Sequence, residues 1–199
     1  MIIYLFIKKI ILASNSKQRK SLFSVLNIPF EVIPADIDEK AIRDDNLKKR
    51  AEKIARAKAE KIKSKYSGIV IAADTFVVLG DKILEKPESL NEARKMLELQ
   101  SGQEVIVYTG FCYLDTLNHI NFSKTSSTIM NIRELSKKEI NIYIKKFPVT
   151  TWSGAFSPAY PYGTTLINKI RGSFTGMTHG LPLELLIPLL KKSGFDVSP

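Results

Sequence analysis

Apolar residues form several nearly uninterrupted runs along the chain, and such runs are typical of buried strands. The longest is Ile69–Leu79, which is rich in Ile and Val. A carboxylate, Asp74, stands in the middle of this run, and burying an ionised Asp without a partner is very costly. The strand could end at Ala73, with Asp74 capping a turn, but the apolar residues that resume after Thr75 favour a continuous strand. Asp74 is therefore expected to have a partner or a chemical role.

The other apolar patterns predict further strands and amphipathic helices. Strands are predicted at residues 10–13, 30–34, 82–84, 105–114 and 120–132, and the first twelve residues are also predicted to be strand. Helices are predicted at 17–26, 46–64, 89–99, 136–146 and 163–170, and a last helix is predicted to start at 181–184. Residues 150–161 are predicted to be irregular, and residues 172–180 to be a loop. Ser89 and Glu92 have the spacing of a helix-capping box.

The first predicted helix carries charges that an isolated helix would not favour. Ser16 is a good N-cap, yet Lys17, Arg19 and Lys20 occupy the first turn, where the macrodipole favours acids. Residues 1–30 contain no acid at all. A helix start with free N–H groups, hydroxyls and cations suits a bound phosphate, and the alternative is a solvated basic turn. The order strand, serine, helix favours the phosphate.

Two more charged stretches are candidates for chemistry. Lys58 lies on the apolar stripe of the helix predicted at 46–64. It either extends along the edge of the core to solvent or points its ammonium toward Asp74. An acidic segment at 36–39 is either a solvated loop or an edge that binds a divalent cation, since hard cations bind carboxylate oxygens.

Composition narrows the class of protein. The 199 residues, 44% of them apolar, suffice for one sizeable core, so one domain spanning 1–199 is expected. Lys and Arg exceed Asp and Glu by 30 to 20, and a net charge of +10 indicates nucleic acid or a phosphorylated small molecule as partner, or only a basic proteome. The lone Cys112 excludes an internal disulfide and a cysteine-rich zinc site, is predicted to be buried, and fits a cytoplasmic location. No membrane segment is predicted, because the apolar start of the chain is short and is interrupted by lysines.

Four stretches occur in the order and spacing of one known family. They are Ala13–Arg19, Ile54–Ala59, Ala73–Thr75 with Leu84–Pro87, and Gly180–Leu183. These stretches resemble the serine–arginine, helix-lysine, aspartate-to-lysine and C-terminal signatures of the Maf family of nucleoside triphosphate pyrophosphatases. The resemblance covers nearly the whole chain. It implies an α/β fold with a mixed, elongated β-sheet, flanking helices and two lobes around a central cleft, related to the inosine-triphosphate pyrophosphatases.

The resemblance also implies a reaction and its site. A nucleoside triphosphate and water would give the monophosphate and pyrophosphate, so the chain would be a hydrolase of acid anhydrides that uses Mg²⁺ or Mn²⁺. Asp74 would be the general base, and Asp74 and Glu39 would hold the metal. Lys58 and Lys86 would hold phosphates at the catalytic centre. The residues implied to bind substrate are Ser14, Ser16, Gln18, Arg19, Thr75 and Ala159.

The sequence leaves open which nucleobase the site accepts. Thr75 fits the dTTP/UTP type of the family. Lys17 stands where the family usually has proline, and Gln18 stands where the pyrimidine type has arginine and the 7-methyl-GTP type a bulky aromatic residue. Ala159 replaces a glutamine of the pyrimidine type, and Val105 replaces its histidine. The expected substrate is dTTP, UTP or a modified nucleotide, with 7-methyl-GTP as the alternative.

Two other functions fit parts of the sequence. A basic nucleic-acid-binding module would explain the net charge and the cations at 17–20 and 48–65, although no nucleic-acid motif is recognised and Asp74 would have no role. The second alternative is a family member that binds nucleotides but does not hydrolyse them. The resemblance further implies a homodimer, since family members are often dimers.

Overall fold

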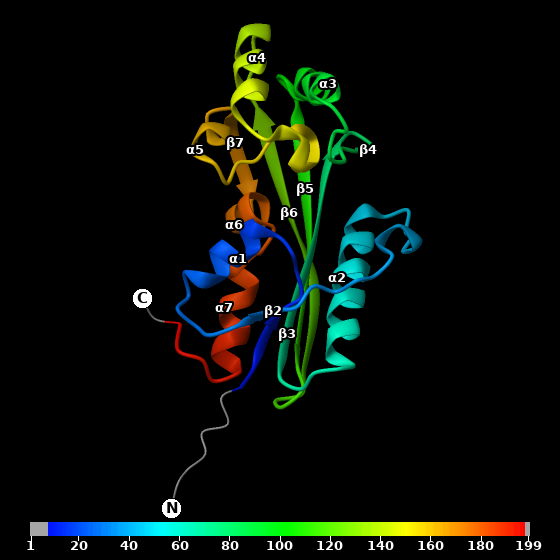
Figure 1. Ribbon diagram of the computed structural model, residues 1–199, viewed down its shortest axis with the longest axis vertical. Coiled ribbons are helices and arrows are strands. Elements are labelled where there is room, and N and C mark those ends of the chain that lie inside the picture. Colours follow the sequence, from blue (N-terminus) through cyan, green and yellow to red (C-terminus); the bar gives the residue numbers. More distant parts are fainter. Residues whose placement is uncertain (1–7, 198–199) are drawn as a thin grey trace, which may run out of the picture. The chain divides into compact units, whose positions relative to one another are not determined.

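The described part of the chain, residues 8–197 of a computed structural model, has a mixed α/β fold. Its strands form one seven-stranded sheet in the order β2-β1-β3-β5-β6-β7, with β4 paired to β3 (Figure 1). β1 is parallel to β2 and β3, whereas β4 is antiparallel to β3 and β7 is antiparallel to β6. The predicted mixed sheet with flanking helices is confirmed. The part of the predicted N-terminal strand before residue 8 lies outside the described residues.

The elements follow the predicted order with few exceptions. The strands are β1 (Ile10–Leu12), β2 (Glu31–Val32), β3 (Ile69–Leu79), β4 (Lys82–Ile83), β5 (Glu104–Asp115), β6 (Ile120–Ile132) and β7 (Ile167–Gly172). The α-helices are α1 (Lys17–Ser24), α2 (Leu47–Lys63), α3 (Leu90–Gln100), α4 (Lys137–Lys146), α5 (Pro161–Thr164), α6 (Phe174–His179) and α7 (Leu183–Lys192). Short 3₁₀ helices are η1 (Glu39–Ala41), η2 (Val149–Thr151) and η3 (Ser153–Ala155). The continuous strand through Asp74 is confirmed.

Two predictions near the C-terminus are wrong. The helix predicted at 163–170 is instead the short α5 followed by β7, which pairs with β6 so that Ile170 lies opposite Met130. The loop predicted at 172–180 contains α6, which Ser173 caps by accepting a hydrogen bond from the Gly176 N–H at 3.0 Å. Pairing with a distant strand overrides the local pattern in the first case. In the second case, a side-chain cap supports a helix too short to show a periodic pattern.

The predicted capping box at the start of α3 is wrong in one contact. Ser89 Oγ accepts a hydrogen bond from the Glu92 N–H at 3.2 Å, as predicted. Glu92 Oε2, however, accepts from the N–H of Glu88 at 2.7 Å instead of that of Ser89. The reciprocal arrangement occurs at α4, between Ser136 and Glu139.

The described chain forms two compact units. Unit 1 comprises the residues up to Asp74, Gly110–Lys124 and the residues from Leu183 onward. Unit 2 comprises Thr75–Thr109 and Thr125–Pro182. The long strands β3, β5 and β6 each contribute residues to both units, and the boundary within β3 falls between Asp74 and Thr75.

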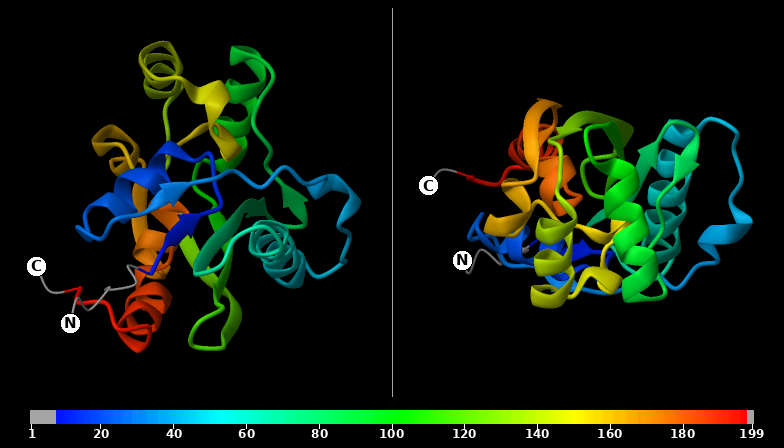
Figure 2. Two further views of the ribbon diagram at one scale, coloured as in Figure 1. Left: turned by 60° about the horizontal axis from the view of Figure 1, so that its bottom comes forward. Right: turned by 90° about the horizontal axis from the view of Figure 1, so that it is seen from above.

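Unit 1 is built from strands with helices on both faces. Figure 2 shows α2 along one face of these strands and α7 on the other. The core on the α2 side consists of small and aliphatic residues from the strands and the helix, namely Ile11, Ala13, Ala55, Ala59, Ile62, Val70, Ala72, Cys112 and Leu114. Burial raises the pKa of Cys112, and its predicted buried state is confirmed. On the other face, Tyr113 contacts Ser193 through a 2.7 Å hydrogen bond.

Unit 2 has its own core between the strands and helices α3 and α4. Figure 1 shows these two helices close together near one end of β5 and β6. The buried residues of this core are Ala93, Leu97, Val105, Val107, Met130, Ile132, Ile140, Tyr143, Ile144, Val149, Trp152, Ala155, Phe156, Leu166 and Met177. The segment predicted to be irregular at 150–161 therefore supplies core side chains, with Trp152 and Phe156 both buried.

Gly110 on β5 lets α2 approach the sheet closely. A Cβ at this position would overlap the carbonyl of Ala51 on α2, a backbone group that has little room to move. We expect Gly110→Ala to lower the free energy of unfolding by about 3 kcal/mol, because overpacking forces the backbone to shift. The measurement is urea denaturation of both proteins.

Gly80→Ala is the matched control, because a Cβ there meets no atom within 4 Å and only the left-handed backbone, with φ of +56°, is unfavourable. Its expected loss is about 1 kcal/mol. A loss for Gly110→Ala no larger than that for Gly80→Ala would show that α2 does not depend on the close approach.

Candidate active site

Asp74 and Lys58 form a buried ion pair between β3 and α2 in unit 1. Alternate residues of a strand point to the same face, so Asp74 shares the face of Val70 and Ala72, which packs against α2. Lys58 lies on the buried stripe of α2 that meets this face. Its Nζ donates a hydrogen bond to Asp74 Oδ1 at 2.8 Å, and the two residues are 8% and 6% exposed. The alternative in which Lys58 extends to solvent is wrong.

Glu39 brings a second carboxylate to the same ammonium. Its Oε1 lies 2.8 Å from Lys58 Nζ, and its side chain is 48% exposed. The preceding Asp38 instead caps η1, since its Oδ1 accepts hydrogen bonds from the N–H groups of Lys40 and Ala41. Within the acidic segment 36–39, Glu39 is therefore the residue that reaches the buried lysine.

The serine–arginine segment folds into a compact start for α1. Ser14 Oγ accepts hydrogen bonds from Arg19 Nη1 at 2.9 Å and from the Ser16 N–H at 3.2 Å. Ser16 caps the helix by accepting from the Arg19 N–H at 3.3 Å, and its hydroxyl donates to Gln18 Oε1 at 3.2 Å. Ser14 thus orients the Arg19 guanidinium, while Ser16 and Gln18 are bonded to each other.

Arg19 belongs electrostatically to the same cluster. The pKa of Arg19 is lowered because burial outweighs the opposing effect of the nearby carboxylates of Asp74 and Glu39. The two carboxylates therefore act on both Arg19 and Lys58, and unit 1 combines two cations and two anions at one place. The structure brings five predicted site residues together here: Ser14, Arg19, Glu39, Lys58 and Asp74.

Ser16 and Gln18 also belong to unit 1, whereas Thr75, Lys86 and Ala159 belong to unit 2. Lys86 is exposed and follows Leu84, whose N–H donates to Val77 O at 2.7 Å. Ala159 is half-buried in the segment before α5. Val105 is fully buried in the hydrophobic core, so its side chain packs against apolar neighbours.

Thr75 is linked to a residue that the sequence reasoning missed. Thr109, buried on β5, donates a hydrogen bond to Gly176 O at 2.8 Å. The hydroxyl of Thr75 lies 3.5 Å from Thr109 Oγ1. Because the Thr109 proton is directed to Gly176, Thr75 is the donor between the two hydroxyls. A threonine in an otherwise apolar run was the signal that could have pointed to Thr109.

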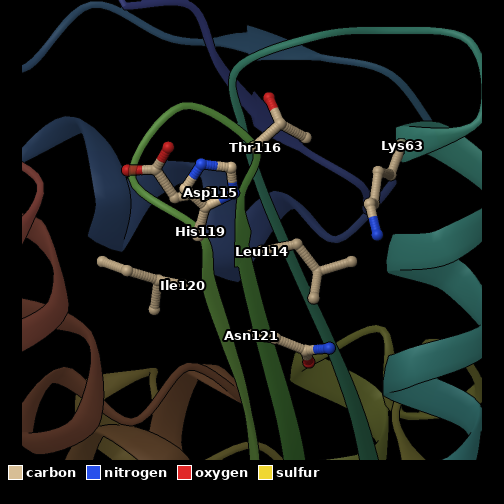
Figure 3. Close-up of a pocket in the computed structure, with 7 residues that line it drawn as sticks. All are labelled: Lys63, Leu114, Asp115, Thr116, His119, Ile120 and Asn121. Atoms are coloured by element: carbon tan, nitrogen blue, oxygen red, sulfur yellow. The ribbon is translucent and has the colours of Figure 1, made fainter.

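A separate cavity of about 270 Å³ lies at the turn between β5 and β6 in unit 1. Figure 3 shows Lys63 reaching it from α2, while the other lining residues come from the end of β5, the turn and the start of β6. Asp115 is the carboxylate there. Burial raises the pKa of Asp115, but the hydrogen bonds from Ser193, Asn118 and Leu117 together lower it by more. The net shift of the pKa is therefore downward. Asp115 therefore stabilises the turn and its contact with Ser193. None of the predicted site residues lines this cavity.

Two findings bear on metals and membranes. Among residues 8–197, no group of three or more His, Cys, Asp and Glu side chains is arranged to hold a metal ion. Asp74 and Glu39 are a pair of carboxylates and not such a group. No helix in the described part of the chain is long and apolar enough to cross a membrane.

Comparisons with known proteins support the family resemblance of the four signature stretches. The family model described as "Maf-like protein" matches residues 9–193. A dTTP/UTP pyrophosphatase of Ruminiclostridium cellulolyticum is 35% identical over 187 residues, covering 93% of this chain and 96% of that protein. A 7-methyl-GTP pyrophosphatase of Nitrosococcus oceani is 31% identical over 189 residues, covering 94% of each. The solved structure of the Staphylococcus aureus Ham1 protein shares the fold, with a TM-score of 0.53 at 16% identity over 94% of this chain and 100% of that one. The chain belongs to the Maf family.

Proposed function

We propose that this chain hydrolyses nucleoside triphosphates to the monophosphate and pyrophosphate. The observation that carries the proposal is the Lys58 ammonium held between Asp74 and Glu39, in the same cluster as an Arg19 that Ser14 orients. This cluster supplies a carboxylate base and cations for phosphate oxygens. Relatives named dTTP/UTP pyrophosphatase and 7-methyl-GTP pyrophosphatase, which align over most of the chain, support the same reaction.

Asp74 is the proposed general base. A water oxygen bonds to a phosphorus of the α–β linkage, the bridging P–O bond breaks, and one water proton moves to the Asp74 carboxylate. Because Lys58 donates to Oδ1, we assign this proton to Oδ2. Nucleoside triphosphate and water are the only reactants, and the monophosphate and pyrophosphate are the only products.

Arg19, Lys58 and Lys86 are the proposed phosphate ligands. Phosphoryl transfer depends mainly on positioning and on neutralising the charge of the phosphate oxygens. An arginine can bind two such oxygens at once, and the Ser14 hydroxyl orients Arg19 for that role. The assignment of Lys86 as a phosphate ligand rests on the family resemblance and on the exposure of its side chain.

The donor set fits a divalent cation. Asp74 and Glu39 supply two hard carboxylates that meet at one ammonium, and Mg²⁺ in nucleotide enzymes is held by one or two carboxylates together with phosphates. When bound, the cation neutralises phosphate charge and polarises the reacting phosphoryl group. Asp74 and Glu39 are the residues that would hold it, with Mg²⁺ or Mn²⁺ as the proposed cofactor.

The proposed base type is that of dTTP and UTP. Thr75 favours this type, and relatives with that name are 35% and 34% identical to the chain, against 31% for a relative named after 7-methyl-GTP. 7-Methyl-GTP is the alternative, because Gln18 and Ala159 depart from the pyrimidine-type pattern. A homodimer and a cytoplasmic location are further proposals that rest on the resemblance.

The test is the initial rate of pyrophosphate release from dTTP, UTP, CTP, GTP and 7-methyl-GTP, each with Mg²⁺ or Mn²⁺. We expect dTTP and UTP to react about tenfold faster than the others, because a base-binding site discriminates by hydrogen bonds that a wrong base leaves unpaired. Faster release from 7-methyl-GTP would reverse the base assignment. Release from none of them, with nucleotide still bound, would identify a binding protein without turnover.

A further inference from the structure

Gln100, the last residue of α3, is a buried amide whose bonds lead toward Lys86. Gln100 is 1% exposed, and burying an amide is costly unless its groups are bonded. Its Nε2 donates to Met96 O on its own helix at 2.9 Å and to Gly154 O at 2.7 Å. Both amide protons are therefore used, and one of them ties α3 to a segment 54 residues away. Its Oε1 has no hydrogen-bond partner among the described residues.

The segment that Gln100 holds has an unusual backbone. Gly154 has φ of 70° and ψ of 13°, and the next residue, Ala155, has φ of 61° although it is not a glycine. Residues other than glycine rarely adopt this left-handed region, so the turn depends on its surroundings. Gly154 and Ala155 are both buried, and the Gln100 amide bonds the Gly154 carbonyl within this turn.

The same turn holds the chain immediately before Lys86. The Gly154 N–H donates to Glu85 O at 3.1 Å. On the other side, the Leu84 N–H donates to Val77 O on β3 at 2.7 Å. The backbone at 84–85 is thus held from two sides, while the Lys86 side chain is exposed.

We infer that Gln100 is a positioning residue for Lys86. It fixes the Gly154 turn, Gly154 fixes the Glu85 carbonyl, and the Glu85 carbonyl fixes the start of the Lys86 backbone. The inference rests on the proposed function, because it assigns Lys86 to the phosphates of a nucleoside triphosphate. Gln100 itself touches no reacting atom, so its whole effect on activity passes through Lys86.

The test variant is Gln100→Met, which keeps the length and volume of the side chain but removes both donors. We expect the KM for UTP to rise about tenfold with a smaller change in kcat, because a displaced phosphate ligand weakens binding of substrate and transition state alike. In a Lys86→Ala background, Gln100→Met should change KM no further. Gln103→Met is the control, since Gln103 is an exposed glutamine three residues away and should leave KM unchanged.

A second readout does not depend on turnover. Hydrogen exchange of the Gly154 amide should be faster in Gln100→Met than in wild type, because the turn loses its tether. If wild type hydrolyses no nucleotide, the proposed function fails, while this exchange still reports on the tether. Unchanged exchange would overturn the tether whatever the activity.

Three other results would overturn the inference. One is an unchanged KM in Gln100→Met. Another is an equal rise in KM with and without Lys86, which would mean that Gln100 acts elsewhere. The third is failure of both Gln100→Met and Gln100→Leu to fold, which would make Gln100 a residue of the core alone.

Discussion

Asp74→Asn is expected to lower kcat for nucleoside triphosphate hydrolysis by about 10³-fold, within the range that general-base catalysis contributes. Asparagine keeps the size of the side chain, and its Oδ1 can still accept the hydrogen bond from Lys58. It cannot take a proton from water, so the loss should appear in kcat while KM changes little. The measurement is steady-state pyrophosphate release at saturating UTP.

Asp115→Asn is the matched control. Asp115 is also a buried aspartate of unit 1, at 2% exposed, but its oxygens accept hydrogen bonds from the Leu117 N–H, the Asn118 N–H and Ser193 Oγ. Its replacement should lower stability and leave kcat within about threefold of wild type, because surrounding structure rather than chemistry depends on it. A kcat for Asp74→Asn as high as that for Asp115→Asn would remove Asp74 from the role of base.

Lys58→Met is expected to lower the free energy of unfolding by about 3–5 kcal/mol, the usual cost of removing one partner of a buried ion pair. Methionine keeps a long apolar side chain at this buried position of α2 but leaves the Asp74 carboxylate without its ammonium. The same change also leaves Glu39 beside Asp74 with no cation between them. The measurement is urea denaturation at neutral pH.

The double variant Lys58→Met with Asp74→Asn should recover part of that stability, since the buried charge is then absent. Lys53→Met is the control on the same helix, because Lys53 has an exposed side chain that forms an ion pair with Asp44 at 2.8 Å. Such surface pairs contribute about 0–1 kcal/mol. Equal losses for the Lys58 and Lys53 variants would contradict the buried pair.

The Asp74–Lys58 pair was one of two alternatives for Lys58, because local periodicities place both residues on packed faces without deciding where the lysine points. The two-residue period of β3 turns Asp74 to the same face as Val70 and Ala72, and the helical period of α2 puts Lys58 on the stripe that packs there. Neither period depends on the rest of the chain. Matching apolar faces therefore make the contact possible, whereas its formation in place of a Lys58 that extends to solvent depends on how α2 packs on β3.

The features that escaped prediction depend on distant partners. β7 forms because it pairs with β6, and its own sequence, with exposed Lys169 and Arg171, has no apolar alternation to reveal it. Gln100 gave no signal, because a glutamine at a helix end is normally solvated. Its role depends on a turn 54 residues further along the chain.

The role of the acidic segment 36–39 could be predicted only in part. Its position after β2 indicated carboxylates near the site, but sequence alone could not separate Asp38, which caps η1, from Glu39, which reaches Lys58. The distinction depends on where the 3₁₀ helix begins, a local choice that leaves no periodic pattern.

The most direct test of the proposed reaction centre is to identify and quantify the products of UTP by ³¹P NMR with Mg²⁺, for wild type and for Asp74→Asn. The Lys58, Asp74 and Glu39 cluster predicts UMP and pyrophosphate in equal amounts from wild type, and almost no product from Asp74→Asn over the same period. Formation of UDP and phosphate, or equal rates for the two proteins, would contradict it.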